Sequence, residues 1–145
     1  TIGTHAGMAV NSFVVEPRFG RVPSAEVLLR ELGRALAGET ALADRLREKE
    51  RAYARPVAAE RAAPSVHWFD GEASGATVIE YRGADAIGLL CRVTAALERC
   101  QLDVRSARVS SLAGSVVDSF YVTTREGKPV PAERRADIEA ELRRA

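Results

Sequence analysis

A ten-residue segment occurs twice in this chain of 145 residues, and the repeat constrains the fold more than any other feature. The sequence AGMAVNSFVV at residues 6–15 returns as AGSVVDSFYV at residues 113–122, an offset of 107 residues with six of ten positions identical. A segment that recurs in this way indicates duplication, and duplicated units adopt similar local structure. We therefore expect two copies of one supersecondary unit.

The two copies differ in completeness. Residues 76–107 precede the second copy, and the same offset places their counterpart before Thr1. The first residue is also threonine rather than an initiator methionine. We therefore expect the chain to begin inside its first repeat and to be a fragment of a longer protein.

Composition indicates a soluble globular chain. Hydrophobic residues make up 46% of it, which is sufficient for a core, and 21 Lys and Arg balance 20 Asp and Glu. This balance gives no support to a dedicated nucleic-acid or acidic-membrane binder. No apolar run approaches the roughly 20 residues of a membrane-spanning helix, and no signal segment opens the chain. We expect a cytoplasmic protein without nucleic-acid or membrane partners.

Residues that could hold a metal or act as nucleophiles are sparse. Cys91 and Cys100 lie nine positions apart on one predicted helix, and steps of about 100° place them on opposite faces, so they cannot pair there. His5 and His67 are distant from both. We find no metal-ligand spacing, paired-carboxylate motif, nucleophile elbow or phosphate-binding glycine loop. We expect no cofactor, no metal site and no catalysis by this chain.

The sequence of the first copy predicts a hairpin followed by a helix. Residues 8–16 are rich in valine and phenylalanine, follow a glycine and stop at a proline, which predicts a strand paired with residues 1–5. Ser24 can cap a helix that ends at Gly38. Its apolar positions have helical spacing and should pack on the sheet; they are Leu28, Leu29, Leu32 and Leu36.

A charged helix, a linker and a short strand follow. Residues 39–54 have strong helix formers and few apolar anchors, which predicts a largely solvated connecting helix. Residues 55–65 contain two prolines and several alanines without periodicity, which is typical of a linker. Residues 66–69 predict a short strand.

The second copy is better defined. Residues 76–83 predict a strand, residues 102–114 and 115–124 a hairpin, and residues 131–145 a charged helix that buries Ile138 and Leu142. Between the first strand and the hairpin lies a helix, residues 88–100, with one apolar stripe of Leu89, Leu90, Val93, Ala96, Leu97 and Cys100.

The element order β-α-β-β-α, with one further strand, predicts an α+β fold of ferredoxin-like βαββαβ units, with an antiparallel sheet and helices on one face. We divide the chain into a truncated first unit (residues 1–38), a connecting helix and linker (39–64), and residues 65–145. The last range holds the second unit and, at its start, a strand that could complete the first.

Neither face of the predicted strand 115–124 is plainly polar, so we expect both faces to be covered by other elements. Val116, Phe120 and Val122 lie on one face, and Val117, Ser119 and Tyr121 lie on the other.

The run ADAIGLLCRVTAALERCQLDVRSARVSSLAGSVVDSFYV, residues 84–122, resembles an ACT domain, a small-molecule-sensing module of amino-acid metabolism. The segment IGTHAGMAVNSFVVEPRFG with the helix after it is similar to the back half of another ACT domain. The family motif after the first strand is DRPGLL. Here it reads Asp85-Ala86-Ile87-Gly88-Leu89-Leu90, which keeps the aspartate, the glycine and both leucines and lacks the arginine and proline.

Two such domains joined by a charged helix, with ERAYARP at residues 50–56, are similar to the C-terminal regulatory region of PII protein uridylyltransferase/uridylyl-removing enzymes. This resemblance implies glutamine sensing by the tandem domains. It also implies control of upstream nucleotidyltransferase and hydrolase domains, with the PII protein as a partner. The chain itself would be regulatory rather than catalytic.

The loop between the first strand and the helix of the second copy is the candidate ligand site. Its backbone N–H groups and the positive end of the helix dipole suit an amino-acid carboxylate, and a glycine permits close approach. The candidate ligand-binding residues are Asp85, Ala86, Ile87, Gly88 and Leu89, with Asp85 near the ligand amine. In the alternative, purely structural interpretation, Asp85 caps the helix, Gly88 serves the turn and Leu89 belongs to the core.

Asn11 and Asp118 are equivalent polar positions in the two repeated strands. A polar side chain on an apolar strand invites a functional interpretation. We favour a structural role, in which each accepts a hydrogen bond from a helix end or an adjacent loop.

Two functions compete. The first is a regulatory module that binds an amino acid, glutamine above others, at a junction between units. The second is a ligand-free module for oligomerisation or protein contact. Because the truncated first copy leaves an unpaired sheet edge and uncovered side chains such as Val14, we expect a homo-oligomer. Phe13 and Phe120 should be buried equivalents.

Overall fold

A computed structural model describes residues 2–5, 8–12, 14, 20–53, 63–71, 75–112 and 114–145. The chain divides into two compact units. The sheet unit comprises Thr1–Ser12 and Val57–Ala145, and the helical unit comprises Phe13–Pro56. Phe13 and most of the expected linker at residues 55–65 lie outside the described residues.

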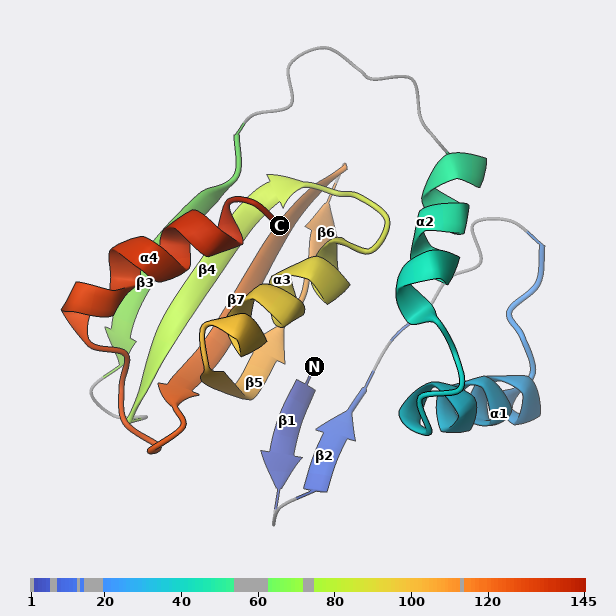
Figure 1. Ribbon diagram of the computed structural model, residues 1–145, viewed down its shortest axis with the longest axis horizontal. Helices are drawn as coiled ribbons and strands as arrows, with labels where there is room; N and C mark the ends of the chain where they lie inside the picture. The colour runs from blue at the N-terminus through green and yellow to red at the C-terminus, as the bar shows by residue number, and fades with distance from the viewer. Residues whose placement is uncertain are drawn as a thin grey trace. The chain divides into compact units, whose positions relative to one another are not determined.

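The sheet unit is built on a seven-stranded sheet with the order β2-β1-β5-β7-β4-β3, to which β6 is attached through β7 (Figure 1). Every described strand pair is antiparallel. Helices α3 (Leu89–Arg99) and α4 (Ala132–Leu142) lie on one face of this sheet (Figure 1). The strands are β1 (Ile2–His5), β2 (Met8–Asn11), β3 (Ser65–Gly71), β4 (Ala76–Ala84), β5 (Leu102–Arg108), β6 (Ser111–Leu112) and β7 (Ser115–Thr124).

The elements β4-α3-β5-β7-α4 follow the predicted β-α-β-β-α order. Strand β7 lies between β4 and β5, as the ferredoxin-like arrangement requires, and the α+β fold class is confirmed. The predicted hairpin is also present, but its second strand ends at Asn11 rather than at residue 16. Strand β1 has four residues, so it offers partners to no more than four residues of β2.

Strand β3 differs from the role we expected for residues 66–69. All seven of its residues pair with β4, from Ser65↔Arg82 to Gly71↔Ala76, at the opposite edge of the sheet from β2. Beside the first strand of the second unit, β3 occupies the place where a ferredoxin-like unit has its last strand. Its long register with β4 is the physical reason, because one continuous ladder satisfies its backbone groups.

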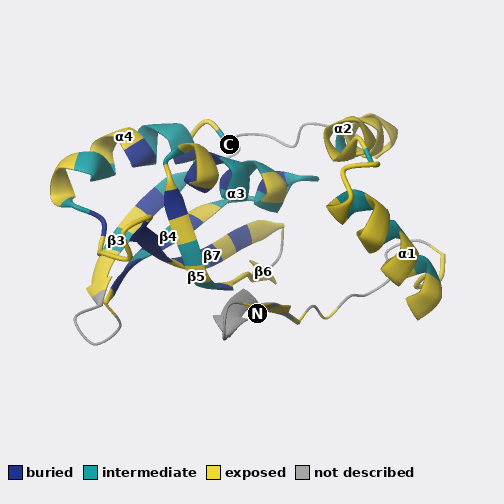
Figure 2. Ribbon diagram, turned by 60° about the horizontal axis from the view of Figure 1, so that its bottom comes forward, coloured by how far each residue is buried: buried dark blue, intermediate teal, exposed yellow. Residues whose placement is uncertain are grey.

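The core of the sheet unit lies between the sheet and the two helices, where both helices bury their predicted apolar faces (Figure 2). Phe120 is 1% exposed, so its predicted burial is confirmed. On the other face of β7, Val117 and Tyr121 remain 40% and 38% exposed. The buried helix residues are Leu89, Val93, Ala96 and Leu97 on α3 and Ile138 and Leu142 on α4.

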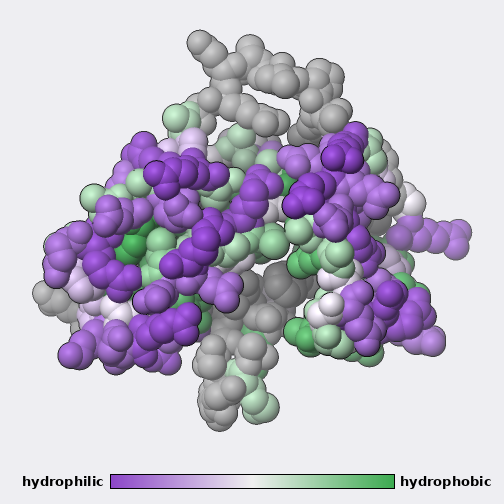
Figure 3. Space-filling model, in the orientation of Figure 1, coloured by the Kyte–Doolittle hydropathy of each residue, from purple (hydrophilic) through white to green (hydrophobic). Residues whose placement is uncertain are grey.

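The helical unit consists of α1 (Ala25–Leu36) and α2 (Leu42–Ala52). The predicted cap is confirmed, since the Val27 N–H donates to Ser24 Oγ over 3.4 Å. Neither helix has a buried residue (Figure 2). The helical unit itself provides no cover for the four leucines of α1, and apolar surface is visible over this helix in Figure 3. Their packing on the sheet stays a prediction.

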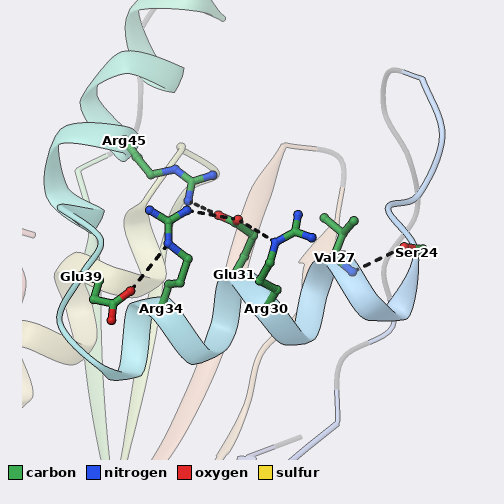
Figure 4. Close-up of polar contacts among 7 residues, drawn as sticks. All are labelled: Ser24, Val27, Arg30, Glu31, Arg34, Glu39 and Arg45. Carbon is green, nitrogen blue, oxygen red and sulfur yellow. Dashed lines mark hydrogen bonds and ion pairs between the residues drawn. The ribbon is translucent and has the colours of Figure 1, made fainter.

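Among the described residues, one ion pair, Glu31–Arg45, links α1 to α2. Glu31 accepts a hydrogen bond from Arg45 Nη1 over 2.9 Å and lies 3.6 Å from Arg34 Nη1 (Figure 4). The hydrogen bond from Arg45 lowers the pKa of the Glu31 carboxyl below its ordinary value. The described contacts between the two helices are thus solvated polar ones, whereas the sheet unit has a buried core.

Candidate ligand-binding site

The loop at residues 85–88 joins the end of β4 to the start of α3. The backbone N–H of Asp85 donates to the carbonyl oxygen of Gly114 over 2.8 Å, which fixes the loop against the start of β7. The side chain of Asp85 is exposed. This arrangement leaves a carboxylate at the surface, next to the beginning of a helix.

Gly88 is the N-cap of α3 and has a φ of +74°, in the left-handed region where glycine is favoured. No side chain caps this helix, so Asp85 does not serve as the cap that the structural interpretation assigned to it. The role of Gly88 in the turn is in contrast supported by its backbone conformation. The first turn of α3 consequently begins without an acidic cap.

The N–H groups of Ile87 and Gly88 donate to no backbone carbonyl among the described residues. The N–H of Leu89 donates to the Ala86 carbonyl oxygen over 3.1 Å, so it is already occupied. The Leu89 side chain is buried in the core, and Ala86 packs against the core from the side. Of the five predicted residues, Ile87 and Gly88 thus offer amides and Asp85 offers a carboxylate.

Arg92, on the first turn of α3, holds the loop from the helix side. Its Nη1 donates to the Ile87 carbonyl oxygen over 2.9 Å, and its Nε donates to the Ala145 carbonyl oxygen over 2.6 Å. The sequence pattern alone did not indicate this residue. An arginine four residues after the glycine was the available signal, but its half-burial and its two acceptors could not be predicted from the sequence.

A buried carboxylate lies near the loop, on β7. Asp118 is 1% exposed, and its Oδ1 accepts a hydrogen bond from the backbone N–H of Ser110 over 3.2 Å. The predicted bond to an adjacent loop is therefore confirmed. Burial raises the pKa of this carboxyl, the Ser110 bond lowers it, and the charge of Asp85 raises it. The side chain of Asn11, its counterpart in the first copy, is outside the described set.

Tyr81 is the cross-strand partner of Asp118 and is 3% exposed. Burial raises the pKa of its hydroxyl, and the positive charge of Arg92 opposes that effect. The ring extends along β4 toward the loop, because a Cβ added to Gly83 would lie 3.2 Å from the hydroxyl oxygen. The sequence did not single out this residue either, since a tyrosine on an apolar strand has the pattern of a core residue.

The part of the chain that the structure describes contains no group of three or more His, Cys, Asp and Glu side chains able to hold a metal ion. Burial raises the pKa of the Cys100 thiol, which disfavours the reactive thiolate. Among the described helices, none is both long and apolar enough to span a bilayer.

The sequence is similar to curated bacterial proteins named bifunctional uridylyltransferase/uridylyl-removing enzyme. The protein from Streptomyces coelicolor is 39% identical over 136 residues, which cover 94% of this chain and 16% of the relative. The proteins from Novosphingobium aromaticivorans and Mycobacterium tuberculosis are 36% and 28% identical and cover 89% and 98% of the chain. The match lies in the C-terminal region of the larger enzyme, and the chain spans 14% to 19% of these relatives' length.

No protein-family model matches the chain. No solved structure matches it either.

Proposed function

This chain belongs to the bifunctional uridylyltransferase/uridylyl-removing enzyme family, and on that premise we propose that it is an amino-acid-sensing regulatory module of such an enzyme. The chain corresponds to a small C-terminal share of its relatives, so catalysis would belong to other parts of the whole protein. We propose glutamine as the ligand and the PII protein as a partner of the whole enzyme, acting in the cytoplasm.

The observation that carries this proposal is the pairing of free amides with a carboxylate at one loop. The Ile87 and Gly88 N–H groups, at the positive end of the α3 dipole, would bind the ligand carboxylate. The exposed carboxylate of Asp85 would bind the ligand ammonium group. An α-amino acid carries both groups, so it matches this loop better than a simple anion or a simple amine does.

The position of the loop provides a means of regulation. Strand β1 of the first repeat pairs with β5 of the second at Ile2↔Ala107 and Gly3↔Ser106, so the two repeats share one sheet. A ligand regulates only if it binds one arrangement of its surroundings more tightly than another. We propose that the ligand favours one arrangement of this shared sheet and thereby changes how the module docks on the catalytic domains.

Calorimetric titration of the 145-residue chain with each common amino acid tests the proposal. We expect heat from glutamine, and weaker binding by Asp85→Asn because this variant removes the charge that faces the ammonium group. Asp103→Asn is the matched control, since Asp103 is an exposed aspartate on β5. If no amino acid produces heat with the wild-type chain, the proposed function is wrong.

The alternative function is a ligand-free module for oligomerisation or protein contact. Exposed apolar side chains favour it: Phe69 on β3 is 51% exposed, and Leu36 on α1 is 80% exposed. Light scattering distinguishes the two functions. Self-association that glutamine leaves unchanged, together with no heat of binding, would support the alternative, whereas a strictly monomeric chain would argue against homo-oligomerisation.

A further inference from the structure

One face of the sheet carries no helix of the sheet unit, because α3 and α4 both lie on the other face (Figure 1). We refer to this surface as the open face. Three large side chains on it are exposed to water: Phe69 on β3 by 51%, and Val117 and Tyr121 on β7 by 40% and 38%. A sheet with apolar side chains on both faces needs a cover on each of them.

A row of cross-strand partners crosses the open face from one edge of the sheet to the other. Cross-strand partners project from the same face of a sheet. The register joins one residue from each strand in the order β3, β4, β7, β5, β1 and β2: Phe69, Val78, Tyr121, Ser106, Gly3 and Val10. Large side chains thus lie on the β3 side of this row, and two small residues follow Tyr121 on its other side.

The internal repeat carries apolar residues at the same places in both copies. The offset of 107 residues relates Val10 to Val117 and Val14 to Tyr121. The two residues of the first copy are also exposed, by 58% and 96%. Single exposed apolar residues are ordinary, but a band that occurs in both copies is typical of an interaction surface.

A neighbouring row on the open face carries opposite charges on the two sides of β7. Glu80 on β4 and Arg108 on β5 are both cross-strand partners of Ser119. Glu80 Oε1 accepts a hydrogen bond from Arg82 Nε over 2.8 Å. Among the described residues, the second carboxylate oxygen of Glu80 and the guanidinium of Arg108 have no partner. The row therefore offers one free acceptor and one free cation.

This pattern is complementary to itself. A two-fold axis that lies between two copies and runs along β7 exchanges β4 with β5 and β3 with β1. Glu80 of each copy then faces Arg108 of the other, and Tyr121 meets its own counterpart near the axis. Phe69 faces Gly3 of the other copy, where no side chain occupies the space. Aligned sheets pack about 10 Å apart in this way in many proteins.

We propose that the chain forms a two-fold symmetric dimer through the open face, in which the sheet of a second copy is the missing cover. The paired charges favour a second copy over a partner of uniform charge such as a nucleic acid, which would meet both signs in one row. This inference goes beyond the proposed function, because it assigns a protein surface and requires no amino-acid ligand.

Charge reversal tests the dimer. In a dimer of Glu80→Arg, two arginines meet at each of two contacts, and in a dimer of Arg108→Glu, two glutamates do so. The dissociation constant of each variant should rise by about tenfold or more, because like charges repel across an interface. Sedimentation equilibrium of the 145-residue chain measures this constant.

An equimolar mixture of the two variants should regain the affinity of the wild-type chain. In the mixed dimer, the new arginine faces the new glutamate at one contact, and native Arg108 faces native Glu80 at the other. An affinity tag on one variant identifies this mixed dimer by retention of the untagged variant. No partner other than a second copy predicts the rescue of two weakened variants by each other.

Glu98→Arg is the matched control, because it makes the same change of charge at an exposed residue of α3, on the other face of the sheet. It should leave the dissociation constant unchanged. Circular dichroism confirms that each variant is folded. If a charge variant is not folded, Phe69→Ala provides a second test and should weaken the dimer by about fivefold or more, as the loss of an interface aromatic does.

A strictly monomeric wild-type chain overturns this inference. Self-association that folded open-face variants leave unchanged also overturns it, and would place the contact at a sheet edge instead. Failure of the mixture to regain affinity excludes the two-fold arrangement. None of these outcomes bears on amino-acid binding, which calorimetry measures separately.

Discussion

Helices α1 and α4 occupy equivalent places in the repeat, yet the two are buried to very different extents. Subtracting the offset of 107 residues from the bounds of α4 gives residues 25–35, which coincide with α1 (Ala25–Leu36). Helix α4 buries Ile138 and Leu142, whereas α1 buries no residue and exposes four leucines. Helical spacing of apolar residues marks the face that can be buried, but burial also requires an element to cover that face.

The two units consequently differ in what stabilises them. The sheet unit gains from the removal of apolar side chains from water, which contributes about 25 cal/mol for each Å² buried. The helical unit has exposed ion pairs such as Glu31–Arg45, and pairs of this kind contribute little to stability. The same type of substitution should therefore have different effects in the two units.

The largest expected effect is the loss of a core side chain. Phe120→Ala should destabilise the sheet unit by about 3–5 kcal/mol, because Phe120 is among the largest fully buried side chains. Leu29→Ala, at a position that is 69% exposed, should change stability by no more than about 0.5 kcal/mol. Denaturant unfolding measures both. An equal effect of the two substitutions would remove the distinction between the units.

Glycine-to-alanine substitutions should change stability in opposite directions in the two units. Gly88 has a φ of +74°, so Gly88→Ala should cost about 1–2 kcal/mol in the sheet unit. Gly33 lies inside α1, and an added Cβ would meet nothing within 4 Å, so Gly33→Ala should stabilise the helix by about 0.5–1 kcal/mol. Thermal melting followed by circular dichroism compares them. A stabilising Gly88→Ala would contradict the described turn.

The Asp118→Asn variant should be more stable than wild type at neutral pH. The pKa of Asp118 is raised in the folded state, so the wild-type chain loses stability as the pH rises from the ordinary carboxyl value of 3.8 through the folded value. The amide does not ionise, so this loss disappears. The melting temperatures of the wild-type chain and of Asp118→Asn should coincide near pH 3 and differ at pH 7. The exposed control Asp103→Asn should show no such divergence.

The smallest effect is expected at the helix–helix ion pair. The pKa of Glu31 is lowered by the hydrogen bond from Arg45, so its contribution is present above the ordinary carboxyl pKa and is lost as the pH falls through the lowered value. Glu31→Gln should therefore reduce helicity slightly at neutral pH. High salt should abolish the difference from wild type, because exposed charges are screened. A difference that persists in high salt would indicate a packing role instead.

Local patterns predicted the parts of the fold that depend on neighbours in sequence. Spacing and residue type were enough to predict the Ser24 cap, the hairpin of β1 and β2, and the burial of Ile138. The partner of β3 was not, because strand pairing is decided by groups distant in the chain. The predicted hydrogen bond of Asp118 was found, although the sequence could not name Ser110 as the donor.

The candidate site shows the same division. The loop and Gly88 were predicted from a motif of adjacent residues. The contribution of Arg92 was not, since one of its acceptors, the Ala145 carbonyl, lies 53 residues away. Tyr81 could not be singled out from the sequence, because an aromatic residue in a strand is ordinarily a core residue. Its cross-strand pairing with Asp118 depends on the register of β4 and β7.

The pairing of β1 with β5 has a consequence for the order in which the sheet opens. The described register joins them at two positions, whereas β4 and β7 pair at eight. Regions with few backbone hydrogen bonds open at low free energy, well before global unfolding. Amide hydrogen exchange should therefore be fast along β1 and slow along β7. Strand β1 would then detach from β5 and pair with it again while the second repeat stays folded. The shared sheet would thus open as two cooperative units, each with its own opening rate.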